Sequence, residues 1–136
     1  MRRVSILIGV CMLASLVLTT IAQQRDLSAI MKDINPAVRA LNMDITNKDA
    51  ATAATDATKL SGLFKEAGAF FKTKNIADAT GWANDASSAA ADAAKAAKAN
   101  NFDDATKAAK TVGGTCKACH DVHREQLPDK TFKLKP

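Results

Sequence analysis

The apolar residues of the chain recur at helical spacing in four successive segments. They form stripes through residues 24–45, 50–72 and 77–99. Such spacing places apolar side chains on one face of an amphipathic helix. A fourth helix opens near Asp103 and is expected to stop before Pro128, which cannot continue it. No stretch shows the two-residue alternation of a strand, so the sequence predicts an all-α protein.

Short polar turns at residues 47–49, 73–75 and 100–101 separate these helices. Four helices of similar length with short turns favour an antiparallel up-down-up-down four-helix bundle. Pro36 lies inside the first helix, removes one backbone hydrogen bond and predicts a kink near residues 32–36. Much of the interior is alanine, the best helix former, which buries little area. This thin core leaves room for another apolar body.

The first 22 residues have the pattern of a cleaved secretory signal peptide. Arg2 and Arg3 precede an apolar run over residues 4–18, and small residues lead to an expected cleavage site after Ala22. The run is short for a membrane span, although a retained signal anchor is the alternative. Cleavage leaves one domain, residues 23–136, without stable membrane insertion. Its last residues, 129–136, are interpreted as a basic tail.

Export changes both the charge and the cysteine count. Lys+Arg falls from 19 to 17 with Arg2 and Arg3 removed, against 14 Asp+Glu, which leaves a formal net charge of +3. This mildly basic balance is unlike that of a nucleic-acid-binding domain. Cys11 leaves with the signal peptide, so only Cys116 and Cys119 remain. A disulfide between them would close too short a loop to constrain the unfolded chain.

The segment Cys116-Lys117-Ala118-Cys119-His120 is the attachment sequence of a c-type haem. Two thiols add to the two vinyl groups on one side of the porphyrin, and the adjacent imidazole binds the iron. A thioredoxin-like pair normally follows a strand at a helix start, and a zinc site needs a second pair of ligands. The sequence offers neither. It predicts one covalent haem c, whose attachment after export indicates the bacterial periplasm.

A haem motif near the C-terminus of a helical chain resembles the class II c-type cytochromes, the group that contains cytochrome c prime. The matching residues are Met31, Trp82, Val112, Gly113 and residues 116–124. His123 stands where the family often has an aromatic residue. The resemblance implies a four-helix bundle around one haem. It also implies that the sixth iron ligand decides function, because some members carry electrons with a methionine there and others bind gases at an empty position.

Helix geometry makes Met31 the candidate for that second axial ligand. At about 1.5 Å per residue, His120 lies roughly 12 Å from the end of the fourth helix and Met31 roughly 10 Å from the start of the first. Met43 would lie roughly 28 Å along the first helix and on its opposite face. The alternative for Met31 is ordinary packing in the core.

Aromatic residues are expected to crowd the porphyrin at the same end of the bundle. The second helix ends there and the third begins there, which brings in Phe64, Phe70 or Phe71, and Trp82. Hydrophobic packing against the haem is their expected role.

Three residues of the fourth helix complete the expected pocket. Gly113 lies one turn before Cys116 and permits close approach of the ring or of a neighbouring helix. Arg124 is expected either to stack near the ring or pair with a propionate, or to be a solvated surface arginine. His123 is on the same helix as His120 and cannot reach the opposite face of the iron, so we expect a partly exposed histidine near the haem edge.

These features predict a periplasmic cytochrome that carries single electrons between redox partners through a His120/Met31 haem. No combination of acid, base and nucleophile is recognisable, so the protein is not expected to be an enzyme. One alternative is a five-coordinate protein that binds nitric oxide or carbon monoxide. Another is a haem relay subunit of a larger complex. A homodimer of such bundles is compatible with the sequence.

Overall fold

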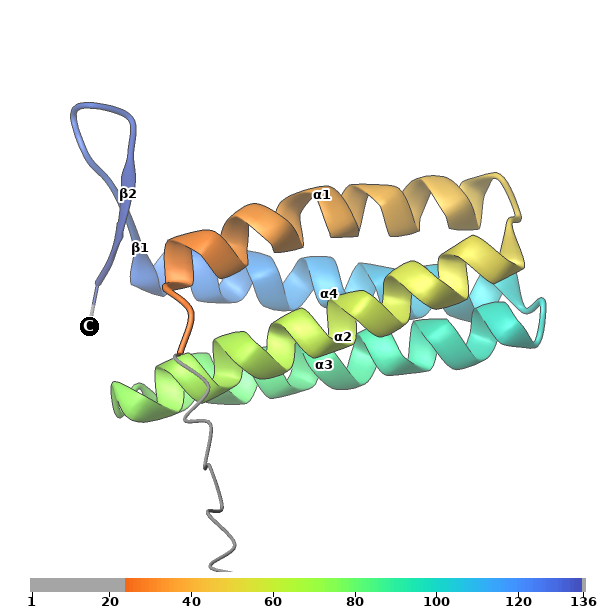
Figure 1. The fold of residues 1–136 in the computed structure, drawn as a ribbon, viewed down its shortest axis with the longest axis horizontal. Helices are drawn as coiled ribbons and strands as arrows, with labels where there is room; N and C mark the ends of the chain where they lie inside the picture. Colours follow the sequence, from red (N-terminus) through yellow and green to blue (C-terminus); the bar gives the residue numbers. More distant parts are fainter. Residues whose placement is uncertain (1–23, 136) are drawn as a thin grey trace, which may run out of the picture.

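The computed structural model describes residues 24–135, so the predicted signal peptide lies outside the described residues. Within this range four helices pack against one another: α1 Leu27–Thr46, α2 Ala50–Thr73, α3 Ala77–Lys98 and α4 Phe102–His123. Short turns reverse the chain between them (Figure 1). The predicted arrangement of four packed helices is confirmed. None of the helices in this range is long and apolar enough to span a membrane.

Each turn between helices contains one residue with a left-handed backbone. Lys48, Asn75 and Asn100 have φ angles of 55°, 56° and 56°. Asparagine tolerates this conformation better than most residues and often ends a helix. After α2 the Ile76 N–H donates to the Phe71 carbonyl at 3.1 Å, which closes the last helical turn. The polar turns predicted from the sequence therefore lie where the chain reverses.

The first helix begins later than predicted and continues through its proline. Asp26 caps α1 by accepting a hydrogen bond from the Ser28 N–H at 3.1 Å, and the helix runs from Leu27 past Pro36 to Thr46. The cap satisfies a donor that has no partner within the helix. Pro36 costs the Lys32 carbonyl its usual partner but does not end the helix.

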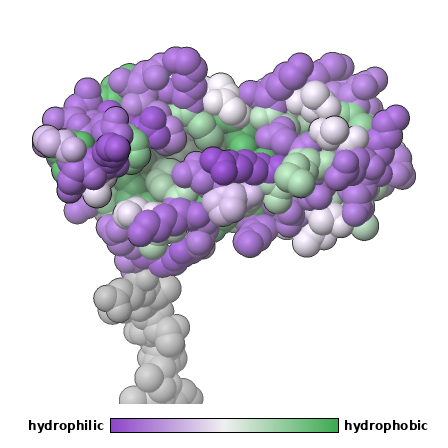
Figure 2. Space-filling view, turned by 90° about the horizontal axis from the view of Figure 1, so that it is seen from above, coloured by the Kyte–Doolittle hydropathy of each residue, from purple (hydrophilic) through white to green (hydrophobic). Residues whose placement is uncertain are grey.

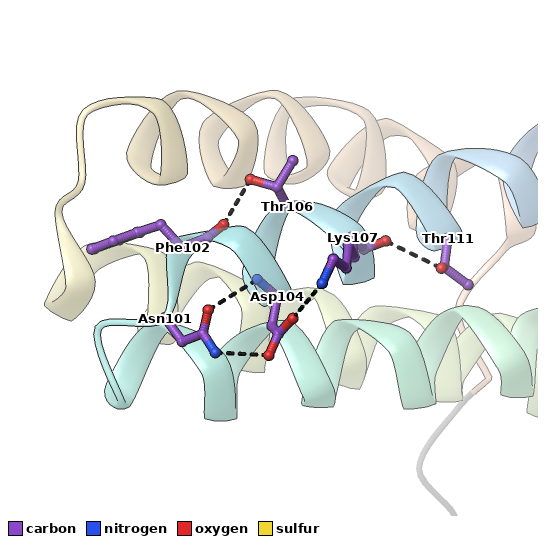
Figure 3. Close-up of polar contacts among 6 residues, drawn as sticks. All are labelled: Asn101, Phe102, Asp104, Thr106, Lys107 and Thr111. Atoms are coloured by element: carbon purple, nitrogen blue, oxygen red, sulfur yellow. Dashed lines mark hydrogen bonds and ion pairs between the residues drawn. The ribbon is translucent and has the colours of Figure 1, made fainter.

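A capping network fixes the start of α4, at the end of the bundle far from the cysteines. Asn101 Oδ1 accepts from the Asp104 N–H at 3.1 Å, and Asn101 Nδ2 donates to the Asp104 carboxylate at 2.7 Å (Figure 3). Lys107 pairs with the same carboxylate at 2.9 Å. The helix consequently begins at Phe102, one residue before the predicted start.

The chain after α4 differs from the prediction. α4 ends at His123 rather than close to Pro128, and an antiparallel hairpin follows, made of β1 Arg124–Gln126 and β2 Phe132–Leu134. Figure 1 shows this hairpin beyond the start of α1. The predictions that no strand forms and that the last residues are only a basic tail are wrong for this segment.

The cause is the turn that joins the two strands. Leu127 N–H donates to the Thr131 carbonyl at 2.8 Å, and the Asp129 carboxylate accepts from the Thr131 N–H at 2.9 Å. Proline followed by aspartate favours such a turn, because proline presets φ and aspartate bonds to nearby backbone. Pro128 therefore belongs to a hairpin turn, well after the helix has ended.

Alanine makes the packing of the bundle uneven. α2 and α3 pack closely along their length through alanines such as Ala57, Ala67 and Ala90, all fully buried. α1 and α4 contact each other much less. The largest fully buried side chains are Ile30, Leu41, Leu60 and Val112. The space for a site is therefore on the α1/α4 side of the bundle.

Candidate cofactor site

The predicted haem motif lies in the last two turns of α4. Cys116, Cys119 and His120 occupy positions i, i+3 and i+4, which a helix presents on one side. All three are half-buried and line a cavity of about 280 Å³ between the helices. Both cysteines are free thiols. The spacing of these three residues therefore places two sulfur-bearing side chains and one imidazole around the same cavity.

Nine of the residues predicted for the site line this one cavity, whereas Phe70 and His123 line only the adjoining groove. The nine come from all four helices and from the first residue of β1. The set is Met31, Phe64, Phe71, Trp82, Gly113, Cys116, Cys119, His120 and Arg124. Met43, rejected as a ligand from helix geometry, is 64% exposed. The bundle thus assembles residues up to 93 positions apart around a common space.

Met31 and His120 reach the cavity from α1 and α4 at a similar level. Because α4 ends at His123 and α1 begins at Leu27, His120 is about 4.5 Å from its helix end and Met31 about 6 Å from its helix start. Both distances are shorter than predicted, by about 7.5 Å for His120 and about 4 Å for Met31, which keeps the two residues within about 2 Å of the same level. The two boundary errors therefore largely cancel, and the residues stay level.

The walls of the cavity are mostly apolar. Phe64 and Phe71 are 5% and 2% exposed, and Trp82 is half-buried beside them. Figure 2 shows apolar surface between polar side chains on the face that carries α1 and the hairpin. A Cβ built on Gly113 would meet no atom within 4 Å. Gly113 thus borders open space, and no neighbouring helix explains the glycine.

Burial raises the pKa of both thiols. Loss of solvent is the main cause at Cys116. The pKa of Cys119 rises to about 11, first because of burial and then because Cys116 and Asp78 are close. Disulfide oxidoreductases need the opposite shift, because the thiolate is the reactive form. At neutral pH these cysteines are protonated, which disfavours the thioredoxin-like interpretation.

The pKa of His120 is lowered, first by burial and then by the positive charge of Arg124. A neutral imidazole keeps the lone pair that a metal ion needs. Among residues 24–135, no three histidine, cysteine, aspartate or glutamate side chains come together as a metal site.

Two polar residues of α1 also line the cavity, although periodicity did not single them out. Asn35 and Arg39 follow Met31 by one and two helical turns. Arg39 and Arg124 are exposed at the cavity and make no ion pair with a described carboxylate. Arg124 also lies over the Phe132 ring, with 4.4 Å between the guanidinium carbon and the ring centre. The i, i+4, i+8 spacing from Met31 is the signal that would have identified both α1 residues.

A groove of about 660 Å³ adjoins the cavity at the hairpin end. Both spaces are lined by Met31, Cys119 and His120. The groove, but not the cavity, is also lined by Phe132 and Leu134 of β2. The candidate iron ligands are therefore approached from two sides, one inside the bundle and one beneath the hairpin.

The predicted partial exposure of His123 is wrong. The side chain is buried, with 6% of the residue exposed, and it bonds to Asp78 and to the backbone of Lys135. Its ring also packs on Trp82, 6.0 Å between ring centres. The sequence suggested partial exposure because the returning hairpin, which covers this side chain, had not been foreseen.

No family model matches the chain, and no characterised protein or solved structure shows significant similarity to it. Function is therefore inferred from the residues of the site.

Proposed function

We propose that the protein is an exported mono-haem c-type cytochrome that carries single electrons between periplasmic redox partners. One observation carries the proposal: Cys116, Cys119 and His120 of α4 line the same apolar-walled cavity as Met31 of α1. The donor atoms are those that a covalent haem requires, two thiols for attachment and an imidazole and a thioether as axial ligands. The empty space beside Gly113 supports a flat group lying close to α4.

Each residue has a separate task in this proposal. Cys116 and Cys119 would hold the porphyrin by thioether bonds, each formed when an S–H adds across a vinyl group without an oxidant. His120 and Met31 would bind the iron from α4 and α1. A bound haem supplies an iron that gains and loses one electron. Phe64, together with the other aromatic residues of the wall, excludes water from it.

The arginines at the cavity suit the carboxylates of the porphyrin. Arg39 of α1 and Arg124 of β1 line the cavity and have no carboxylate partner among the described residues. Guanidinium groups bind carboxylates with paired, charge-assisted hydrogen bonds. We therefore assign these two residues to the propionates, with Asn35 as a further hydrogen-bonding group.

Met31 favours electron transfer over gas binding. A methionine sulfur stabilises ferrous iron and raises the reduction potential. A filled sixth position also leaves no site for nitric oxide or carbon monoxide. The gas-binding alternative requires that Met31 does not ligate, and a relay subunit would share the site and differ only in its partners.

The attachment is tested by replacing both cysteines. The parent, produced in a periplasm with haem-attachment machinery, should retain haem under denaturing conditions. Cys116→Ser/Cys119→Ser should retain none, because no other described thiol is present. Each single variant should still carry haem through one bond. Denaturation-resistant haem in the double variant would show that the attachment site lies elsewhere.

A further inference from the structure

His123 joins three parts of the molecule that are distant in sequence. Its Nδ1 lies 2.9 Å from the Lys135 carbonyl oxygen, and its Nε2 lies 3.0 Å from Asp78 Oδ2. Both partners are acceptors, since hydrogen bonding to His123 lowers the pKa of the Asp78 carboxyl and favours its charged form. The Lys135 carbonyl oxygen can only accept, so Nδ1 is the donor in that bond. Asp78 is in the first turn of α3, and Lys135 directly follows β2.

The backbone adds a second link between His123 and the end of the hairpin. The Lys135 N–H donates to the His123 carbonyl at 2.7 Å. His123 and Lys135 thus exchange two hydrogen bonds, one through the backbone and one through the ring. The ring is also packed against Trp82 of α3. A buried polar side chain with both nitrogens satisfied stabilises one arrangement of its neighbours.

Apart from Leu134, which is partly buried and packs against the core, the hairpin has few other contacts to hold it. Its strands are three residues long, and Phe132 is 53% exposed. Its ion pair, Lys133 with Glu125 at 3.1 Å, joins two exposed side chains. Isolated two-stranded hairpins are marginally stable in water, and exposed ion pairs add little. The bonds of His123 are therefore the main polar anchor that ties this hairpin to the bundle.

The position of the hairpin matters because it is a wall of the groove beside the candidate site. Phe132 and Leu134 line this groove together with Met31 and His120. Met31 and His120 are half-buried, and movement of β2 away from α1 would widen the access from solvent to both side chains.

We propose that His123 is a positioning residue that latches the C-terminal hairpin to α3 and so holds β2 in place as a wall that narrows the groove beside Met31 and His120. The latch follows from the described contacts. Its role in guarding the iron rests on the proposed function as well.

The latch is tested by amide hydrogen exchange in the haem protein. His123→Phe keeps an aromatic ring against Trp82 and loses both hydrogen bonds, so the Lys135 and Leu127 amides should exchange about tenfold faster or more. His123→Asn places an amide nitrogen near the position of Nδ1 and should return much of the Lys135 protection. Lys133→Ala, which removes only the exposed ion pair, should leave both amides close to the parent. Parent-like exchange in His123→Phe overturns the latch.

A second variant tests the same link if the first one does not fold. Should His123→Phe fail to fold, Asp78→Ala removes the exposed partner carboxylate and should give the same faster exchange at Lys135. Unchanged exchange in a folded Asp78→Ala overturns the link from the hairpin to α3.

Carbon monoxide binding to the reduced Met31→Ala protein tests the guarding role, because the sixth position of the iron is open in that variant. This ligand is uncharged, so its attraction to the site does not depend on the charge of the side chain at position 123. Binding should become severalfold faster when His123→Phe is added to Met31→Ala, and it should stay unchanged when Asp92→Asn is added, since Asp92 is exposed on α3 and does not line the groove. Faster amide exchange with an unchanged binding rate overturns the guarding role. If the purified chain carries no covalent haem, the proposed function fails, and amide exchange alone still decides whether His123 latches the hairpin.

Discussion

Met31 is the residue on which the choice between electron transfer and gas binding depends. Replacing it with alanine should convert a low-spin iron to high-spin, because the sulfur ligand is lost. The reduction potential should fall by on the order of 0.1 V, within the ~0.8 V range that axial ligands control. The variant should also gain carbon monoxide binding. Visible spectra and a redox titration of the two proteins measure these changes.

Met43→Ala is the matched control, because Met43 is on the same helix but 64% exposed. Its spectrum and potential should equal those of the parent. An unchanged spectrum in Met31→Ala, with a parent that already binds carbon monoxide, would replace the electron carrier with a gas-binding protein.

The lowered pKa of the Asp78 carboxyl predicts how the stability of the fold changes with pH. Its pKa is lowered mainly by the hydrogen bond from His123 and then by one from the Ala79 N–H. A depressed carboxyl pKa stabilises the folded state above the unfolded value of about 3.9, and this contribution is lost as pH falls through the lower folded value. The melting temperature of the parent should therefore drop more steeply below about pH 4 than that of Asp78→Asn.

Thermal melts of both proteins between about pH 7 and pH 2 measure this difference. Asp92→Asn, an exposed substitution on the same helix, is the control and should follow the parent curve. Parallel curves for the parent and Asp78→Asn would mean that the bond to His123 does not stabilise the fold.

At the scale of single elements, substitutions at two neighbouring glycines of α4 distinguish the effect of helix propensity on stability from the effect of cavity shape on haem binding. An added Cβ meets no atom within 4 Å at either Gly113 or Gly114, but only Gly113 lines the cavity. Gly114→Ala should stabilise the helix by about 0.5–1 kcal/mol and raise the melting temperature. Gly113→Ala should reduce the yield of covalent haem protein, because the methyl group occupies space needed by the ring.

The yield is measured as haem absorbance per mole of polypeptide after identical expression. Equal yields for the two variants would show that no flat group lies against Gly113.

The four helices were predictable because their signals are local. Apolar periodicity marks each helix, and Asn75 and Asn100 mark two of the turns with left-handed backbone. The hairpin was not predictable in the same way. Its strands are short, and its anchor joins His123 to Asp78, 45 residues away. A contact over such a separation leaves no periodic pattern, so the same histidine was expected to be partly exposed.

The grouping of the site residues was predictable for a different reason. Residues at the same level of an antiparallel bundle can be found by counting along helices, and the errors in the ends of α1 and α4 largely cancelled for Met31 and His120. Asn35 and Arg39 were missed because they are polar and interrupt the apolar stripe, although they share the side of α1 that lines the cavity. Counting along helices places the residues around the site, whereas the haem that they are proposed to bind is inferred from their chemistry.

At the scale of the whole molecule, the loose packing between α1 and α4 predicts that the proposed haem, once bound, stabilises the bundle. The interior elsewhere is mainly alanine, and Phe64, Phe71 and Trp82 line the cavity. A small domain has a stability margin of only about 5–15 kcal/mol. Protein made without haem should therefore lack a fixed tertiary structure at physiological temperature, whereas the haem protein melts cooperatively.

Circular dichroism decides this point. Weak near-ultraviolet signals and a broad far-ultraviolet transition are expected for the haem-free chain. A cooperative melt with fixed aromatic signals would show that the helices pack without any bound group.

The visible absorption spectrum of the oxidised protein, produced with haem attachment in a periplasm, tests the central claim most directly. We predict the bands of a low-spin iron with a methionine-sulfur charge-transfer band near the red edge, and haem that stays with the denatured polypeptide. High-spin bands would contradict ligation by Met31, and a polypeptide without covalent haem would contradict the assignment of Cys116, Cys119 and His120.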